Sequence, residues 1–335
     1  MKNLNESMRL VSEFSTDAVE RIPTRDGYGK GLVAAGKADD RVVVLCADLT
    51  ESTRSHWFAE EFPERFIQVG VAEQNMAVLA SGMAAAGKIP FISSYATFSP
   101  GRNNEQIRTN VCINNQPVKI AGSHAGVSVG PDGATHQALE DIALMRVVPR
   151  MNVIVPCDAI QAEKATIAAA TNGQPTYIRL GREKTPVVTT EKTPFEAGRA
   201  QIFRDGTDVA IIACGAQVYD ALVAAEWLSK DGIECMVVNN HTIKPLDEAV
   251  IRKAARLCGA VVTVEEHQIA GGLGSAVAEN LAQDKPVPIE FVGMKDRFGE
   301  SGSPAELLAH FGLDSDGIIA AVQRVLQRRT KRRVK

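Results

Sequence analysis

Residues 41–48, "RVVVLCAD", are the stretch from which the fold can be worked out. They contain a short, unbroken apolar run rich in β-branched valine. A strand with one wet face alternates apolar and polar residues, whereas an unbroken run is typical of a parallel strand covered on both faces. The stretch therefore predicts a mostly parallel sheet between two layers of helices.

Strand-like and helix-like runs alternate on both sides of this stretch, which predicts two open, mostly parallel α/β domains. The segment between about 183 and 200 is rich in Pro, Thr and charge and predicts a linker. No repeat relates the two halves. The expected units are an N-terminal extension (1–20), a first domain (21–185), a linker (186–200), a second domain (201–325) and a basic tail (326–335).

Composition excludes several classes of function. The net charge of −3 gives no electrostatic support for nucleic-acid binding, and no apolar run is long enough to span a membrane. The basic end "RVLQRRTKRRVK" is interpreted as a solvated, frayed terminus rather than a nucleic-acid site. Six scattered cysteines, without a CxxC pair, predict reduced buried thiols in a cytoplasmic protein: Cys46, Cys112, Cys157, Cys214, Cys235 and Cys258.

Glu73 is the first residue that points to chemistry. It stands in "FIQVGVAEQNMAVLASGMAAAG", residues 66–87, between a short apolar run and a helix of small residues. A lone buried carboxylate is costly, so it is usually paired, neutralised or used. The alternative is a charge that is simply favoured at a helix N-terminus by the helix dipole.

Polar segments follow the predicted strands of the first domain, where open α/β sheets bind ligands. They span residues 47–53, 94–102, 123–137 and 180–183. The third holds His124, Asp132 and His136 among glycines. These side chains could ligate a metal, exchange protons or bind a polyol, and their spacing fixes no metal site. An ordinary loop with a helix N-cap at Thr135 would have the same composition.

Longer motifs resemble a known family. "VGVAEQNMAVLASGMAAAG", "SSYATF" and "HAGVSVGPDGATHQALEDIALMRVVPRMNVIVPCD" are similar to the pyrimidine-binding domain of transketolases. "TIKPLD", "VVTVEEHQIAGGLGSAVAE" and "RFGESGSPAELLAHFGL" are similar to the transketolase C-terminal domain. The resemblance covers residues 20–325, whereas the GDG motif of the family's diphosphate-binding domain does not occur.

The resemblance implies the C-terminal subunit of a split transketolase. Such an enzyme transfers a two-carbon ketol unit from a ketose phosphate to an aldose phosphate, with thiamine diphosphate and Mg²⁺ or another divalent cation. A separate N-terminal subunit would carry the GDG motif and the metal ligands, so an α2β2 heterotetramer is expected, and this chain is expected to bind no metal itself.

Cofactor residues follow from the same resemblance. Glu73 matches the glutamate that hydrogen-bonds N1′ of the aminopyrimidine ring and activates the cofactor. Tyr95 and Phe98 match aromatic residues that pack on this ring, and Asp48 matches an aspartate near the cofactor and the protomer interface. Arg102 is placed with the cofactor residues, although the family pattern has other residues there.

Substrate residues form a second group. His136 matches a histidine near the donor's C1 and C2 oxygens, and it is assigned a catalytic role beside Glu73. Asp132 matches the aspartate that reads the hydroxyl configuration at C2 of the acceptor. The resemblance assigns phosphate binding to Arg25, Ser52, His124 and Arg182, and arginine suits this task because it makes bidentate charge-assisted bonds.

The sequence departs from the family pattern at three places and leaves alternatives open. Ala125 replaces a frequent aspartate, "GPDG" replaces "GEDG", and a family tyrosine is replaced near Gly101. The alternatives are a 1-deoxyxylulose-5-phosphate synthase, a 2-oxoacid dehydrogenase β subunit and an inactive binding partner. A dinucleotide site at "GGLGSA" is disfavoured because the full GxGxxG context is absent.

Overall fold

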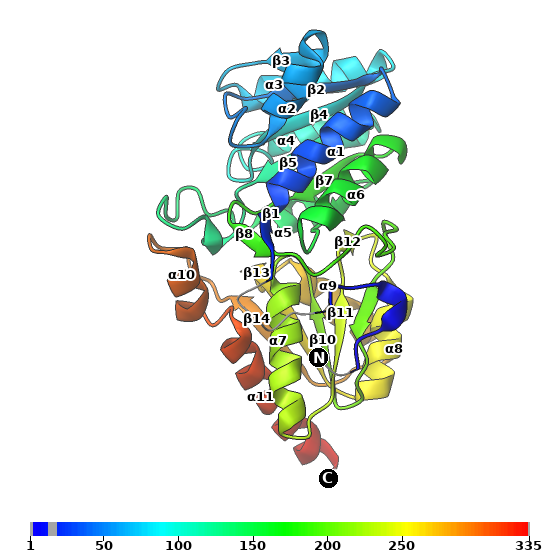
Figure 1. The fold of residues 1–335 in the computed structure, drawn as a ribbon, viewed down its shortest axis with the longest axis vertical. Helices are drawn as coiled ribbons and strands as arrows, with labels where there is room; N and C mark the ends of the chain where they lie inside the picture. Colours follow the sequence, from blue (N-terminus) through cyan, green and yellow to red (C-terminus); the bar gives the residue numbers. More distant parts are fainter. Residues whose placement is uncertain (1–2, 13–18, 334–335) are drawn as a thin grey trace.

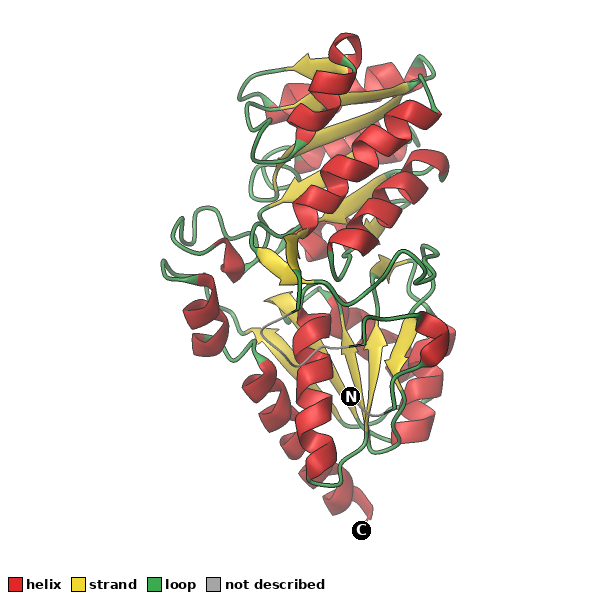
Figure 2. Ribbon diagram, in the orientation of Figure 1, coloured by secondary structure: helices red, strands yellow, loops and turns green. Residues whose placement is uncertain are grey.

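The computed structural model describes residues 3–12 and 19–333 of the chain. Two α/β domains, each a sheet with helices on both faces, lie one above the other along the long axis of the molecule (Figures 1 and 2). Both sheets are mostly parallel. The predicted fold class is confirmed.

The first sheet has the order β12-β6-β7-β5-β4-β2-β3 within the described residues. All pairings are parallel except that of the edge strand β12 with β6. Its strands are β2 (Val42–Cys46), β3 (Phe66–Gln68), β4 (Ile89–Tyr95), β5 (Lys119–Ser123), β6 (Asn152–Ile154), β7 (Thr176–Arg179) and β12 (Thr242–Lys244). Its helices are α1 (Thr24–Ala38), α2 (Ser55–Glu61), α3 (Glu73–Ala85), α4 (Asn104–Gln106), α5 (Asp141–Arg146) and α6 (Ala159–Thr171).

The unbroken apolar run of β2 is buried on both faces, as its sequence predicts. Val42 and Val44 belong to a hydrophobic cluster with residues of α1, α2 and α6. Val43 and Leu45 belong to another cluster that includes Met76 of α3. Helices therefore bury both faces of this strand, which leaves the strand ends as the place for polar chemistry.

The second sheet has the order β14-β13-β10-β11-β9 within the described residues, with β9 antiparallel to β11. Its strands are β9 (Gln201–Arg204), β10 (Val209–Ala213), β11 (Cys235–Asn239), β13 (Val261–Gln268) and β14 (Ile289–Met294). Its helices are α7 (Gln217–Lys230), α8 (Glu248–Cys258), α9 (Leu273–Asp284), α10 (Pro304–His310) and α11 (Ser315–Arg333).

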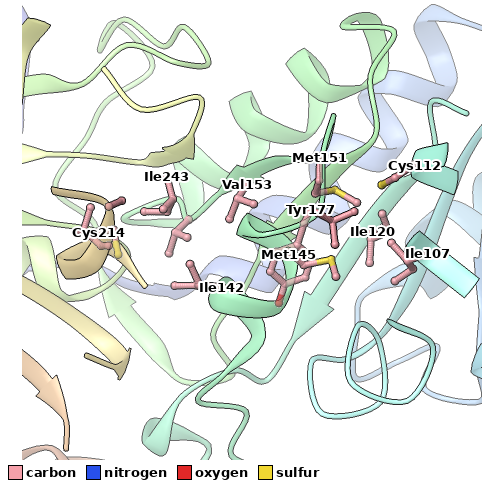
Figure 3. Packing of buried hydrophobic residues seen from close by; sticks show 14 of the residues in the cluster. Ile107, Cys112, Ile120, Ile142, Met145, Met151, Val153, Tyr177, Cys214 and Ile243 are labelled. Atoms are coloured by element: carbon pink, nitrogen blue, oxygen red, sulfur yellow. The ribbon is translucent and has the colours of Figure 1, made fainter. Parts of the chain in front are cut away.

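The two domains are built into one another. Strand β12 comes from the second half of the sequence but pairs with β6 of the first sheet. At the junction, β1 (Arg21–Pro23) pairs antiparallel with β8 (Lys184–Pro186), as Figure 1 shows. One hydrophobic cluster runs from Ile107 through Met145 to Cys214 and Ile243, and so crosses from one domain to the other (Figure 3).

The predicted linker region is firmly held rather than loose. The carboxylate of Asp158 accepts hydrogen bonds from the backbone N–H groups of Val188 and Thr189 and from the hydroxyl of Thr189. The same carboxylate caps α6 through the backbone N–H of Gln161. The Lys164 ammonium donates to the carbonyls of Thr190, Glu191 and Thr193, so side chains of the first domain hold this segment at several points.

Three local features are not evident from the sequence pattern. After the turn that follows β4, a short α4 is continued by a π-helix over Ile107–Ile113. Near the end of the described chain, α10 has 7 residues and α11 has 19. The sequence predicts a frayed basic end, whereas α11 continues to Arg333, and the Arg329 guanidinium donates to the carbonyls of Asp208 and Cys258.

Two predictions from composition can be compared with the structure. All six cysteines are buried and none forms a disulfide, as predicted. In the part of the chain that the structure describes, no helix is both long enough and apolar enough to cross a bilayer.

Candidate functional site

Four polar loops meet at one edge of the first sheet. They follow β2, β4, β5 and β7, which are consecutive neighbours in the sheet. Because these strands are parallel, their carboxyl ends lie at the same edge. The loops therefore bring together side chains that are far apart in the sequence, as predicted.

Glu73 is the first residue of α3, and only 2% of it is exposed. Its carboxylate Oε2 accepts a hydrogen bond of 2.8 Å from Nη1 of Arg102. Its backbone carbonyl accepts a hydrogen bond of 3.1 Å from the side-chain amide of Asn103. The buried carboxylate is thus paired, and its place in the first turn of the helix adds a favourable dipole interaction.

A tight turn after β4 returns the chain to Glu73. The backbone N–H groups of Phe98 and Ser99 both donate to the Tyr95 carbonyl. A Cβ on Gly101 would lie 2.1 Å from the Thr97 carbonyl oxygen, so this position requires glycine. The turn places the Arg102 guanidinium 4.6 Å from the centroid of the Phe98 ring. The tight turn at Gly101 therefore brings Arg102 to Glu73.

Aromatic rings and both histidines form one cluster beside this turn. The rings of Tyr95 and His124 are stacked, with centroids 3.8 Å apart. The His136 ring stands edge-on to Phe98, with centroids 5.6 Å apart, and edge-on to Tyr95 at 6.2 Å. The structure thus brings four of the predicted residues into mutual contact.

His124 is neutral and holds Arg25. Burial, followed by the nearby Arg25 and Arg182 guanidinium groups, lowers the pKa of His124 to about 3. Nη1 of Arg25 lies 3.3 Å from Nε2 of His124 and donates to the Ser52 carbonyl at 2.9 Å. Because arginine can only donate, Nε2 is the acceptor, and Nδ1–H then donates to the Ser123 hydroxyl at 2.9 Å.

Arg182 lies on the same side of the site. Its Nη1 donates to the Val129 carbonyl at 2.7 Å, which ties it to the loop after β5. Burial, then Arg54 and to the smallest extent Arg182, lower the pKa of Arg25. Two guanidinium groups at the same edge of the sheet suit the binding of an anion.

The loop after β5 holds His136 in place but leaves Asp132 exposed. His136 is fixed, because its carbonyl accepts a hydrogen bond from the Thr97 hydroxyl and its Nδ1 lies 2.9 Å from the Thr135 hydroxyl. Asp132 is exposed, and no hydrogen bond or ion pair joins its carboxylate to the described residues. The structure therefore places Asp132 on the same loop but does not draw it into the cluster.

Asp48 marks the end of β2 on the other side of the site. It is exposed, with a positive φ of 58°, and its backbone N–H donates to the Gln68 side chain at 2.8 Å. The Gln68 amide in turn donates to the Thr50 hydroxyl. The loop is shaped by its backbone, and the Asp48 carboxylate remains available at the surface.

Two scaffold residues were missed by the sequence analysis. The Gln137 side-chain amide donates to the carbonyls of Val127, Gly130 and Glu300, and so binds the loop after β5 to the second domain. The buried Glu266 carboxylate accepts a hydrogen bond of 2.6 Å from the Ser128 backbone. Glu266 follows an apolar run at the end of β13, a signal that could have identified it as a strand-end carboxylate.

The site has groups suited to an organic cofactor and an anion. Glu73 presents a buried carboxylate, and the Arg102 guanidinium that pairs with it lies over the ring of Phe98. Arg25 contributes a buried Nε that has no hydrogen-bond partner among the described residues. Within those residues, no three His, Cys, Asp or Glu side chains come together in a way that could hold a metal ion.

Comparison with known proteins identifies the two domains. The model of the transketolase pyrimidine-binding domain matches residues 20–187, and that of the transketolase C-terminal domain matches residues 198–318. Together these models account for most of the chain, including the four loops of the site.

Similar proteins are separate C-terminal halves of transketolases. The putative transketolase C-terminal section of Methanocaldococcus jannaschii is 44% identical over 91% of this chain and 96% of its own length. The 6-deoxy-6-sulfo-D-fructose transketolase subunit SqwH of Clostridium sp. is 41% identical over 92% of this chain and 96% of its own length. The solved structure of a split gene transketolase, an inactive β4 tetramer, has a TM-score of 0.86 and 47% identity, covering 91% of this chain and 99% of that chain. From its two domains and these matched relatives, the chain belongs to the transketolase family as the C-terminal subunit of a split enzyme.

Proposed function

We propose that this chain forms a thiamine-diphosphate-dependent enzyme with a separate N-terminal subunit and transfers a two-carbon ketol unit between sugar phosphates. The observation that carries the proposal is the buried Glu73 carboxylate, linked through Arg102 to the ring of Phe98, with a cluster of histidine and arginine side chains around that ring and Tyr95. The first set suits a flat nitrogen heterocycle, and the second suits a phosphorylated polyol.

Glu73, Tyr95 and Phe98 would hold the aminopyrimidine end of the cofactor. When bound, thiamine diphosphate supplies a nucleophilic thiazolium carbon and an electron sink for C–C cleavage. Glu73 would hold a hydrogen bond at N1′, in a place where burial excludes competing water. Phe98 would pack against the ring, and Asp48 would lie near the cofactor at the protomer interface. Arg102 lines the same site.

His136 and Asp132 would orient the sugars. The Thr97 and Thr135 contacts hold the His136 ring, so that it can bond to the donor's C1 and C2 oxygens. Asp132, exposed on the same loop, would accept a hydrogen bond from the acceptor's C2 hydroxyl. A carboxylate discriminates here because a missing or inverted hydroxyl leaves it unpaired.

Arg25, Ser52, His124 and Arg182 would bind the sugar phosphate. The partnerless Nε of Arg25 supports this role, because a buried donor without an acceptor is suited to an incoming oxygen. Neutral His124 would act through Arg25, which its Nε2 holds in place. The backbone carbonyl of Ser52 accepts a hydrogen bond from Nη1 of Arg25, the same nitrogen that contacts His124.

The N-terminal subunit would carry the GDG motif and the ligands for Mg²⁺ or another divalent cation. An α2β2 heterotetramer follows if each cofactor lies between the two kinds of subunit. The similar split gene transketolase forms an inactive β4 tetramer, which supports the expectation that the C-terminal subunit does not work alone. Buried, unbridged cysteines support a cytoplasmic location.

The test is made on this chain co-expressed with a candidate N-terminal transketolase subunit that contains the GDG motif. Ketol transfer from xylulose 5-phosphate to ribose 5-phosphate is assayed with thiamine diphosphate and Mg²⁺. Pyruvate with glyceraldehyde 3-phosphate, and a 2-oxoacid with an artificial electron acceptor, are assayed in parallel. The proposal predicts turnover of the ketose phosphate, whereas turnover of the 2-oxoacids alone would assign the pair to one of the alternative enzyme classes.

A further inference from the structure

We propose that Arg102 occupies the place of the aminopyrimidine ring in the free subunit and has to leave when thiamine diphosphate binds. The inference rests on the proposed function, because it assumes that Glu73 and Phe98 receive this ring. It changes the role of Arg102 from a contact with the cofactor to an internal occupant of the cofactor's place.

Arg102 makes both contacts that the incoming ring would need. Its guanidinium donates to Oε2 of Glu73 at 2.8 Å, and its central carbon lies 4.6 Å from the centroid of the Phe98 ring. A guanidinium is flat, delocalised and rich in donors, and it stacks on aromatic faces. An aminopyrimidine is also flat and would meet the same carboxylate and the same ring.

The two groups compete for the same space. Two flat groups cannot both lie against the side of Phe98 that Arg102 covers, because a stacked group occupies that surface fully. A guanidinium bound to the carboxylate would also oppose the sharing of a proton between Glu73 and a ring nitrogen. For both reasons, the aminopyrimidine ring should replace the Arg102 guanidinium rather than bind beside it.

Arg102 is placed so that it can leave. Its side chain is 46% exposed, whereas that of Glu73 is 2% exposed. Within the described residues, the bond to Glu73 is the only hydrogen bond that its guanidinium makes. Its backbone is held separately, because its N–H donates to the Phe98 carbonyl. The side chain can therefore rotate into solvent without disturbing the turn.

Arg102 also shields a costly group in the unassembled subunit. An unpaired carboxylate at the first turn of α3 would be buried without a charged partner, which is unfavourable. The arginine neutralises Glu73 until a cofactor with the required donor arrives. Arg102 therefore stabilises the free subunit, and its displacement weakens cofactor binding.

The test compares two variants in the complex with the N-terminal subunit. Arg102→Met keeps an apolar stem beside Phe98 but removes the charge and the donors, whereas Arg102→Lys keeps a cation that can pair with Glu73. Thiamine diphosphate is titrated at fixed Mg²⁺ by isothermal calorimetry. We expect Arg102→Met to lower the Kd by about 3- to 10-fold, and Arg102→Lys to stay within about 2-fold of wild type.

A double variant shows whether the change in Kd comes from competition between Arg102 and the cofactor for Glu73 or from a general effect of the substitution. In a Glu73→Gln background, Arg102 loses its charged partner, so adding Arg102→Met should change the Kd by less than about 2-fold. If Arg102→Met does not assemble, Arg102→Gln provides the same comparison, because it removes the charge but keeps a donor.

Two results would overturn the inference while leaving the proposed function intact. Weaker binding in Arg102→Met would make Arg102 a ligand of the bound cofactor, and unchanged binding would make it a bystander. If the wild-type complex binds no thiamine diphosphate, the proposed function itself fails, and the inference fails with it.

Discussion

In the proposed mechanism, the chemistry depends on Glu73. Glu73→Gln keeps the size and the hydrogen-bonding atoms but cannot supply an acidic proton at N1′. We predict that the variant assembles with its partner and that kcat falls by at least about 100-fold, the usual contribution of a positioned proton donor. Steady-state kinetics with saturating cofactor would check this, and a near-normal kcat would show that Glu73 is not the activating acid.

Arg182 allows a test of the phosphate assignment. Arg182→Ala removes a guanidinium and should raise KM for phosphorylated sugars more than for the unphosphorylated sugars, by about 10-fold in relative terms. Arg199→Ala, at an exposed arginine outside the site, serves as the control. Equal effects of Arg182→Ala on both substrate classes would mean that the residue only holds the loop through Val129.

His124 should make the stability of the fold depend on pH. Its pKa is lowered by burial and neighbouring arginines from an ordinary 6.5 to about 3, so the unfolded chain binds the extra proton first as the pH falls. The stabilising effect of the neutral ring is present above pH 6.5 and is lost progressively between 6.5 and 3. When the pH is lowered from 7 to 5, the free energy of unfolding should fall in wild type. In His124→Asn, we expect this fall to be smaller by about 2 kcal/mol.

Urea unfolding of the isolated chain at both pH values would measure this difference. The comparison with His124→Asn is needed because Glu265 and Asp220, whose pKa values burial raises to about 7, act in the opposite direction. Equal pH dependence in the two proteins would show that His124 already titrates near its ordinary pKa in the folded state.

At the scale of elements, the turn after β4 has no space for a larger side chain at Gly101. A Cβ at Gly101 would meet the Thr97 carbonyl oxygen at 2.1 Å, whereas a Cβ at Gly82 in α3 would meet no atom within 4 Å. Gly101→Ala should destabilise the isolated chain by at least about 2 kcal/mol. Gly82→Ala should instead stabilise it by up to about 1 kcal/mol, as expected for a helix interior.

Denaturant unfolding of the two glycine variants provides the measurement. Gly101→Ala should lower the free energy of unfolding, and Gly82→Ala should raise it. A tolerated alanine at 101 would mean that the turn can relax, and the position of Arg102 against Glu73 would then not depend on the glycine.

The sequence predicted the site loops better than the contacts inside them. The apolar run of β2 and the polar strand ends follow from burial and the geometry of parallel sheets, which act locally. The contact between Glu73 and Arg102 depends on a turn whose shape is set by Gly101 and the Tyr95 carbonyl. Periodicity carries no information about such a turn, nor about the π-helix that follows it.

At the scale of the whole molecule, the sequence predicted the two domains, but not the contacts that join them. Strand β12 is only three residues long, and its pairing with β6 comes from a different half of the chain. Short strands with distant partners have no sequence signal of their own. The anchoring of the linker has no sequence signal either, because it depends on Asp158 and Lys164, two side chains outside the linker.

This joining explains why the second domain belongs in the same subunit as the site. Gln137 and Glu266 fasten the loop that carries His136 and Asp132 to the second domain. Gln137→Glu removes the amide that donates to three carbonyls. We predict a KM for the acceptor sugar that rises more than kcat falls, with Gln283→Glu, at an exposed position in α9, as the control. A proportional loss for every substrate would indicate a general structural defect instead.

The most direct test of the account compares turnover by this chain alone, by the GDG-containing subunit alone and by the co-expressed pair. Ketol transfer between sugar phosphates is measured with thiamine diphosphate and Mg²⁺ at equal subunit concentrations. The account predicts activity in the pair and none in either chain alone. Turnover by this chain alone would contradict it, because the groups expected from the partner would then not be required.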